Sequence, residues 1–196
     1  RQKLRPIHIL AAYLIAVFKP HYLIAFAYVY GVILIGNYVR QRALVAAIAA
    51  IISLLPLYFF RETISELSFA ILPHFYGGST RDAYWLSEYD VFWKAPAGMA
   101  IGFFGPTLTE ALEAKNVLHV ATFIENIGLT CVFAYYMLRN VGSLPAYALI
   151  LSVVAIFWIM FPNYPFGVMN PGSAIRYRTG YEVLMFVLFA VFLLRQ

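Results

Sequence analysis

The chain has 196 residues, of which 63% are hydrophobic and 12% are charged, and its formal net charge is +5. Soluble domains carry about 25% charged residues, so this composition and the mean hydropathy of +0.77 exclude an ordinary soluble globule and predict an integral membrane protein. Basic residues flank apolar runs instead of forming one stripe, which excludes nucleic acid as a partner and makes the lipid bilayer the expected one.

The apolar runs predict an all-α fold, a polytopic membrane helix bundle in a single transmembrane domain over 1–196. A bilayer core takes roughly 20 apolar residues per helix, so the length allows about five or six crossings. Lys19 and Pro20 separate the first two runs, and because proline lacks a backbone donor and lysine avoids the bilayer centre, a hairpin of short helices is favoured over one kinked helix. The predicted spans are 7–18, 22–36, 43–60, 117–138, 144–161 and 181–194.

The segment over 62–116 has a different composition and is predicted to be long, external and interfacial. Aromatic side chains alternate with acidic ones between Tyr84 and Trp93, as is typical where rings lie at the level of the lipid headgroups. Anchoring is favoured over a sugar-stacking platform. The run Ala97–Phe104 is too short to cross the bilayer and is flanked by glycine and proline, so a re-entrant or surface-lying piece is expected.

Positive charges predict the orientation, because cytoplasmic loops carry an excess of lysine and arginine. The predicted spans place seven basic residues on one side, which makes the N-terminus cytoplasmic. The 62–116 segment and the 162–180 loop then share the external face, which is the natural place for a site. The seven residues are Arg1, Lys3, Arg5, Arg40, Arg42, Arg139 and Arg195.

Glu125 and Asn126 lie within an apolar span. A carboxylate in a membrane is costly, so Glu125 is a candidate catalytic residue that needs a partner such as Arg81, Lys94 or Arg176. The alternative is a buried hydrogen bond between helices, in which Asn126 braces a neighbouring helix.

Arg176 and Arg178 lie in the second external loop, just before the last predicted span. Guanidinium groups bind phosphates and carboxylates through two parallel hydrogen bonds, so these residues are candidates for substrate binding. Anchoring to lipid headgroups explains them equally well. His74, in the other external segment, is a candidate acid or base.

Familiar catalytic motifs are absent from the sequence: it contains no HExxH, CxxC, P-loop, GxGxxG or serine elbow. No metal site and no cofactor is predicted. Ligation of haem or a chlorin by His8, His21 or His119 is the less favoured alternative, because their spacing forms no pair.

Two stretches, Ala95–Leu129 and Asn170–Phe186, resemble segments of bacterial O-antigen polymerase-like proteins, which are multi-span proteins encoded with surface-polysaccharide genes. In those proteins a proline-centred segment with a following acidic residue precedes a helix containing Glu-Asn, and an Asn-x-Gly-x-x-x-Arg-x-Arg loop precedes the last helices. They have more spans than this chain allows, which leaves catalysis open. The matching positions are Pro106, Glu110, Glu125, Asn126, Asn170, Gly172, Arg176 and Arg178.

The resemblance implies a protein of the bacterial inner membrane that handles a polyprenyl-diphosphate-linked glycan on its external face. Arg176, Arg178 and Asn126 would bind the substrate, and Glu125 or His74 would assist glycosyl transfer. The competing hypothesis is a non-catalytic subunit of a larger membrane complex, such as an energy-transducing one with pigment or haem. A transporter is a third alternative, which lacks the expected inverted repeat.

Overall fold

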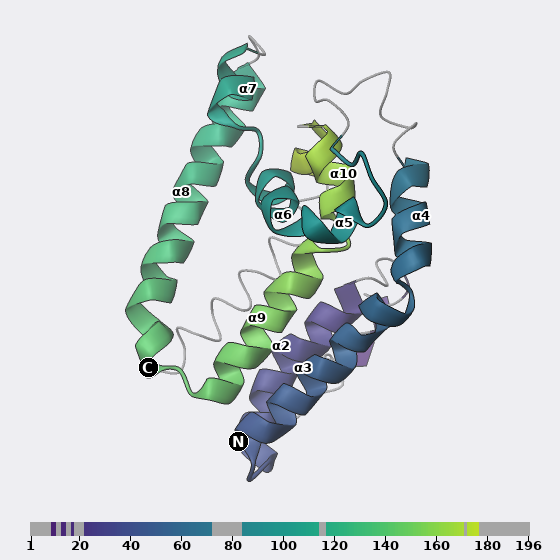
Figure 1. The fold of residues 1–196 in the computed structure, drawn as a ribbon. Helices are drawn as coiled ribbons and strands as arrows, with labels where there is room; N and C mark the ends of the chain where they lie inside the picture. Colours follow the sequence, from purple (N-terminus) through teal and green to yellow (C-terminus); the bar gives the residue numbers. More distant parts are fainter. Residues whose placement is uncertain are drawn as a thin grey trace. The chain divides into compact units, whose positions relative to one another are not determined.

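The structure is a computed structural model that describes residues 9–10, 13–14, 17, 22–71, 84–113, 117–170 and 172–176. These residues form helices, turns and loops without any strand, so the all-α prediction is confirmed (Figure 1). The chain divides into two compact units. The first comprises Arg1–Leu55, Asn140–Ile159 and Tyr181–Gln196, and the second comprises Pro56–Arg139 and Met160–Gly180.

The first unit contains three long helices that lie side by side (Figure 1). They are α2 (Tyr22–Tyr38), α3 (Arg42–Phe59) and α9 (Ala146–Met160), and the short 3-10 helix η2 (Val141–Ser143) precedes α9. The first unit includes α3 as far as Leu55 and α9 as far as Ile159. These helices coincide with the apolar runs that the sequence analysis placed at 22–36, 43–60 and 144–161.

Small side chains and two hydrogen bonds hold these three helices together. The Tyr28 hydroxyl donates to the Ala49 carbonyl at 2.6 Å and thereby links α2 to α3. The indole N–H of Trp158 donates to the Ser53 hydroxyl at 3.3 Å and links α9 to α3. The buried residues of α3 are Ala46 and Ala50.

Most of α3 is apolar and exposed. The helix has 18 residues and a mean hydropathy of 2.0, yet only 11% of it is buried. Among the described residues it is the one helix that is long and apolar enough to cross a membrane, and the full bundle of five or six crossings stays a prediction. Three shorter apolar stretches accompany it, at Leu23–Tyr38, Val117–Val132 and Ala146–Met160.

The second unit is built mainly from shorter helices. Its predicted external segment is largely helical, and the run predicted to be too short for a crossing forms α6, a helix of ten residues. The long helix of the unit coincides with the run predicted over 117–138. The elements are α4 (Arg61–Ile71), α5 (Asp90–Trp93), α6 (Ala95–Phe104), α7 (Leu108–Glu113), α8 (Val117–Asn140) up to Arg139, and α10 (Tyr164–Met169).

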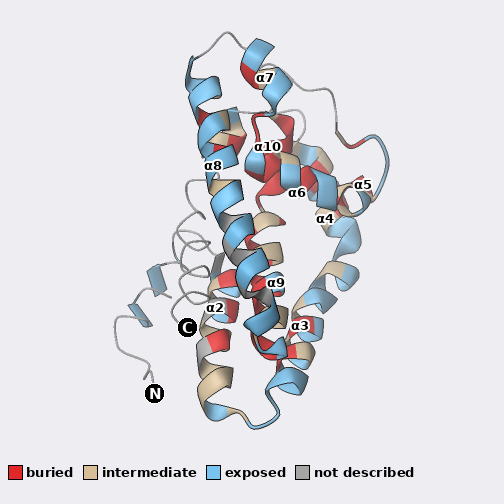
Figure 2. Cartoon of the chain, turned by 90° about the vertical axis from the view of Figure 1, so that its left-hand side faces the viewer, coloured by how far each residue is buried: buried red, intermediate tan, exposed pale blue. Residues whose placement is uncertain are grey.

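Helices α6 and α10 pack against each other through glycines, and α10 is largely buried, whereas α6 buries one side with Gly98 and Gly102 (Figure 2). A Cβ atom added to Gly167 would lie 2.6 Å from the carbonyl oxygen of Gly102 and 3.0 Å from its Cα. One added to Gly98 would lie 2.7 Å from the Tyr164 ring. Glycine therefore lets the two backbones touch, as small residues do between membrane helices.

Two predictions fall on residues that the structure does not describe. The predicted span 181–194 lies outside the described residues, and so does most of 7–18. The same is true of Lys19 and Pro20, so the choice between a hairpin and one kinked helix over 7–36 stays a prediction.

Substitution of Gly167 by alanine is expected to destabilise the chain, because its methyl group would overlap the Gly102 backbone. Overpacking of this kind costs about 1–3 kcal/mol. In thermal unfolding of the detergent-solubilised chain, we expect Tm to fall by about 2–4 °C for each kcal/mol lost. The matched control is Gly128→Ala on α8, where a Cβ would meet nothing within 4 Å. An equal Tm for both variants would contradict the close helix crossing.

Candidate functional site

The Tyr164 side chain is the centre of an aromatic cluster that joins α10 to α5. Its hydroxyl donates a hydrogen bond to the Val91 carbonyl. The Trp85 ring meets it edge-on with centroids 5.8 Å apart, and Phe161 lies 5.9 Å away and stacks on Phe92 at 6.0 Å. Burial raises the pKa of the Tyr164 hydroxyl well above its usual range. This residue therefore stays a neutral hydrogen-bond donor and has a structural function.

An ion pair closes the loop before α5. Lys94 Nζ lies 2.8 Å from Asp90 Oδ2 and also donates to the Tyr84 carbonyl at 2.8 Å. The same carboxylate accepts hydrogen bonds from the Leu86 N–H at 2.9 Å and the Ser87 hydroxyl at 2.8 Å. The ammonium of Lys94, with the Leu86 amide next in effect, holds the pKa of Asp90 well below its usual range. From the sequence, Lys94 is one of three possible partners of Glu125. In the structure, Lys94 forms an ion pair with Asp90.

The aromatic residues of the same loop are divided between core and surface. Trp85 is 2% exposed and belongs to the core, whereas Trp93 is 82% exposed. A ring at the level of the headgroups must be exposed. Trp93 therefore suits the predicted anchoring, and Trp85 does not.

The two neighbouring candidates on α8 have different surroundings. Asn126 is 4% exposed, and its side-chain nitrogen donates to the carbonyls of Phe104 at 2.9 Å and Gly105 at 2.8 Å. These carbonyls end α6, where the helix itself leaves acceptors without partners. Asn126 thus braces a neighbouring helix, which is the structural alternative, while Glu125 is exposed.

The loop after α10 is shaped by Asn170. Its side-chain oxygen accepts hydrogen bonds from the N–H groups of Gly172, at 2.8 Å, and Ser173, at 3.4 Å. An asparagine in this position starts a helical turn by satisfying its first donors. The described part of this turn covers residues 172–176, and Arg176 in it is exposed.

Glu110 and Pro106, two further positions of the resemblance, also have local structural functions. The Glu110 carboxylate accepts a hydrogen bond from the Thr107 N–H at 2.7 Å, and the Thr107 hydroxyl lies 3.4 Å from the Glu110 N–H. This reciprocal arrangement is a capping box that starts α7. Pro106 is fully buried just before it.

The second unit contains every candidate site residue, but the structure describes only some of them. Of the candidates that the structure describes, Glu125 and Arg176 are charged and exposed. Glu125 adjoins Asn126, and Arg176 follows Asn170 by six residues; both asparagines form hydrogen bonds with backbone groups. His74 and Arg178 lie outside the described residues, as does Arg81, another proposed partner of Glu125. In the part of the chain that the structure describes, no three His, Cys, Asp or Glu side chains are grouped to hold a metal.

Sequence reasoning missed the structural importance of Tyr164 and of the Asp90–Lys94 pair. The i,i+4 spacing of the pair was a readable signal, since such residues face each other on a helix. The spacing of Gly98 and Gly102 was another, because small residues four apart favour close helix contact. Nothing local indicated that Tyr164 is their partner.

No protein-family model matches the chain, and no curated protein or solved structure is significantly similar to it. The resemblance to O-antigen polymerase-like proteins therefore stays a prediction. The functional argument has to start from the described residues.

Replacement of Asn126 by alanine is expected to lower stability, because two carbonyls at the end of α6 lose their shared donor. Leaving buried acceptors unsatisfied costs about 1–3 kcal/mol. The control is Thr122→Val on the same helix, which removes only a hydrogen bond to the Leu118 carbonyl within α8. Thermal unfolding should show the larger loss for Asn126→Ala, and equal losses would argue against the brace.

Asp90→Asn is expected to destabilise the chain at pH 7 by removing the partner of Lys94. The depressed pKa of Asp90 means that its carboxylate stabilises the fold above the unfolded pKa of about 4, and that this contribution is lost as the pH falls toward the folded value. The Tm difference between parent and variant should therefore narrow below about pH 4. Glu88→Gln, which removes an exposed carboxylate from the same loop, is the control. If the Tm difference between parent and Asp90→Asn stayed constant from pH 7 to below about pH 4, the ionisation of Asp90 would not contribute to stability in this way.

Proposed function

We propose that the chain is a polytopic protein of the bacterial inner membrane that handles a polyprenyl-diphosphate-linked glycan on its external face. The apolar, exposed surface of α3 supports the membrane placement, since such a surface is stable in lipid and costly in water. Arg42 is the first residue of α3, and Arg61 follows two positions after its last residue. The positive charges before α3, at Arg40 and Arg42, support a cytoplasmic start for this helix.

The observation that carries the glycan proposal is the crossing of α6 with α10. It packs α6, which begins the first stretch that resembles polymerase-like proteins, against α10, which ends just before the second stretch begins at Asn170. Asn126, next to Glu125, binds the carbonyls that end α6, and Asn170 binds the N–H groups of Gly172 and Ser173 in the turn that contains Arg176. The same compact unit thus displays an exposed carboxylate and an exposed guanidinium.

These two groups suit glycosyl transfer from a diphosphate carrier. In that reaction the bond between the anomeric carbon and the diphosphate oxygen breaks, and a new bond forms to an acceptor hydroxyl. Arg176, with Arg178, would stabilise the negative charge on the departing diphosphate. Glu125 or His74 would accept the proton that the acceptor hydroxyl releases.

A non-catalytic subunit is the second candidate, and the surface of α8 favours it. Ile124 is 63% exposed and Ile127 is 48% exposed, so α8 presents apolar side chains near Glu125 that suit a neighbouring protein helix. Purification in mild detergent distinguishes the two candidates. Co-purifying subunits with a visible absorption spectrum would favour the complex, and a polyprenyl-linked glycan alone would favour the polymerase-like function.

Arg176→Ala is expected to abolish growth of the surface polymer while the protein still accumulates in the membrane. Removal of one group that stabilises developing charge costs about 100-fold or more in rate. The measurement is polymer length on gels beside the protein level by immunoblot. Arg139→Ala, which removes an exposed arginine at the end of α8, is the matched control and should leave polymer length unchanged. Normal polymer in the Arg176→Ala strain would refute the proposed binding role.

A further inference from the structure

Charge is distributed unequally between the two units. Seven of the fourteen lysines and arginines belong to the first unit, but only one of the nine acidic residues does, Glu182. None of the described residues of this unit is acidic. Arg40 and Arg42, the basic side chains among them, therefore have no carboxylate partner within the described part of their unit.

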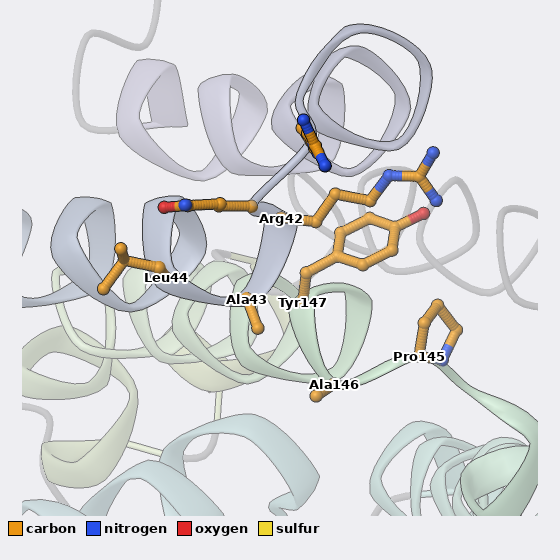
Figure 3. Close-up of a pocket in the computed structure, with 8 residues that line it drawn as sticks. Arg42, Ala43, Leu44, Pro145, Ala146 and Tyr147 are labelled. Carbon is orange, nitrogen blue, oxygen red and sulfur yellow. The ribbon is translucent and has the colours of Figure 1, made fainter.

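These two arginines line an open pocket of about 540 Å³ in the first unit (Figure 3). The pocket lies where α3 and α9 begin, and residues 40–44 and 145–147 form it. We name it the arginine pocket. Its lining combines Arg40, Arg42 and Tyr147 with the apolar residues Ala43, Leu44 and Pro145.

The Arg42 guanidinium is held in place at the pocket. Its Nε donates to the Val39 carbonyl at 3.1 Å, and its central carbon lies 5.8 Å from the centre of the Tyr147 ring. Figure 3 shows the guanidinium and the Tyr147 hydroxyl extending to the same side. Neither contact neutralises the charge, so the group is oriented and still available to an anion.

The backbone adds to this positive potential. Helices α3 and α9, of 18 and 15 residues, both begin at the pocket. The first N–H groups of a helix have no acceptor within it, and they carry the positive end of the helix dipole. The two arginines and the two helix starts therefore both contribute positive electrostatic potential at the pocket.

We propose that the arginine pocket binds the phosphate of an anionic phospholipid in the cytoplasmic leaflet. The proposal rests on the membrane placement and orientation given above, which bring Arg40 and Arg42 to the level of the headgroups. The guanidinium groups match the phosphate, while Ala43, Leu44 and Pro145 offer apolar surface to the glycerol and upper acyl chain. An anionic lipid supplies a negative charge, which the described residues of the first unit do not provide.

The test uses the purified full chain, stripped of lipid in detergent and then offered equal amounts of phosphatidylglycerol and phosphatidylcholine. Native mass spectrometry counts the lipid retained. The variants are Arg40→Gln with Arg42→Gln, Arg40→Gln alone, and the charge-preserving pair Arg40→Lys with Arg42→Lys. Arg61→Gln, an exposed arginine of the second unit that pairs with Glu62 at 3.5 Å, is the matched control. A parallel sample receives inorganic phosphate in place of lipid.

We expect the parent to prefer phosphatidylglycerol, and the double glutamine variant to bind it roughly 25-fold more weakly, with about fivefold for Arg40→Gln alone. The lysine pair should retain most binding, and Arg61→Gln should equal the parent. Arg40 is exposed, so its single variant reports on binding even where the double variant folds poorly.

Equal retention of the two lipids, or parental binding by the glutamine variants, would overturn the proposal. Binding of inorganic phosphate without a preference between the lipids would overturn the lipid assignment. Failure to retain either lipid would argue against the membrane placement itself. Polymer growth is a separate readout, so normal polymer in Arg176→Ala beside selective lipid binding would refute the proposed function and leave this inference standing.

Discussion

The backbone contact between α6 and α10 is the constraint on which the second unit depends. Gly102 and Gly167 approach so closely that no side chain fits between them. One turn away, the Tyr164 ring covers Gly98 and its hydroxyl reaches the Val91 carbonyl of α5. Helices of six and ten residues cannot bury much area alone, so close dispersion contact joins α10 to α6, and the buried hydrogen bond of Tyr164 joins α10 to α5.

The candidate site depends on this crossing in two steps. Helix α6 ends beside α8, where Asn126 binds its last carbonyls, and α10 ends at Asn170, which starts the turn toward Arg176. Both asparagines use their polar atoms on backbone groups, which would otherwise lack partners. The charged residues beside them, Glu125 and Arg176, are exposed. The polar residues of the resemblance therefore differ in their surroundings: the two asparagines bind backbone groups, and the two charged residues are exposed.

The sequence predicts the helices of this protein better than their contacts. Long apolar runs determine α2, α3, α8 and α9, and glycine with proline predicts that α6 is short, because these are local properties. The partner of Gly102 is more than 60 residues away along the chain, and no local pattern identifies it. Glu125 and Asn126 are both candidate site residues in the sequence, but successive helix residues point about 100° apart, and here Asn126 is buried and Glu125 is exposed.

The two units satisfy their charges by different means. In the second unit the buried carboxylate of Asp90 has Lys94 and several backbone donors, as a charge removed from water requires. In the first unit Arg40 and Arg42 have no described carboxylate within reach, and they line an open pocket instead. Arginine without a protein counterion is stable where water or an external anion solvates it. The exposed apolar surface of α3 begins at the same residues, so in the proposed membrane placement a lipid phosphate is the anion present there at the highest concentration.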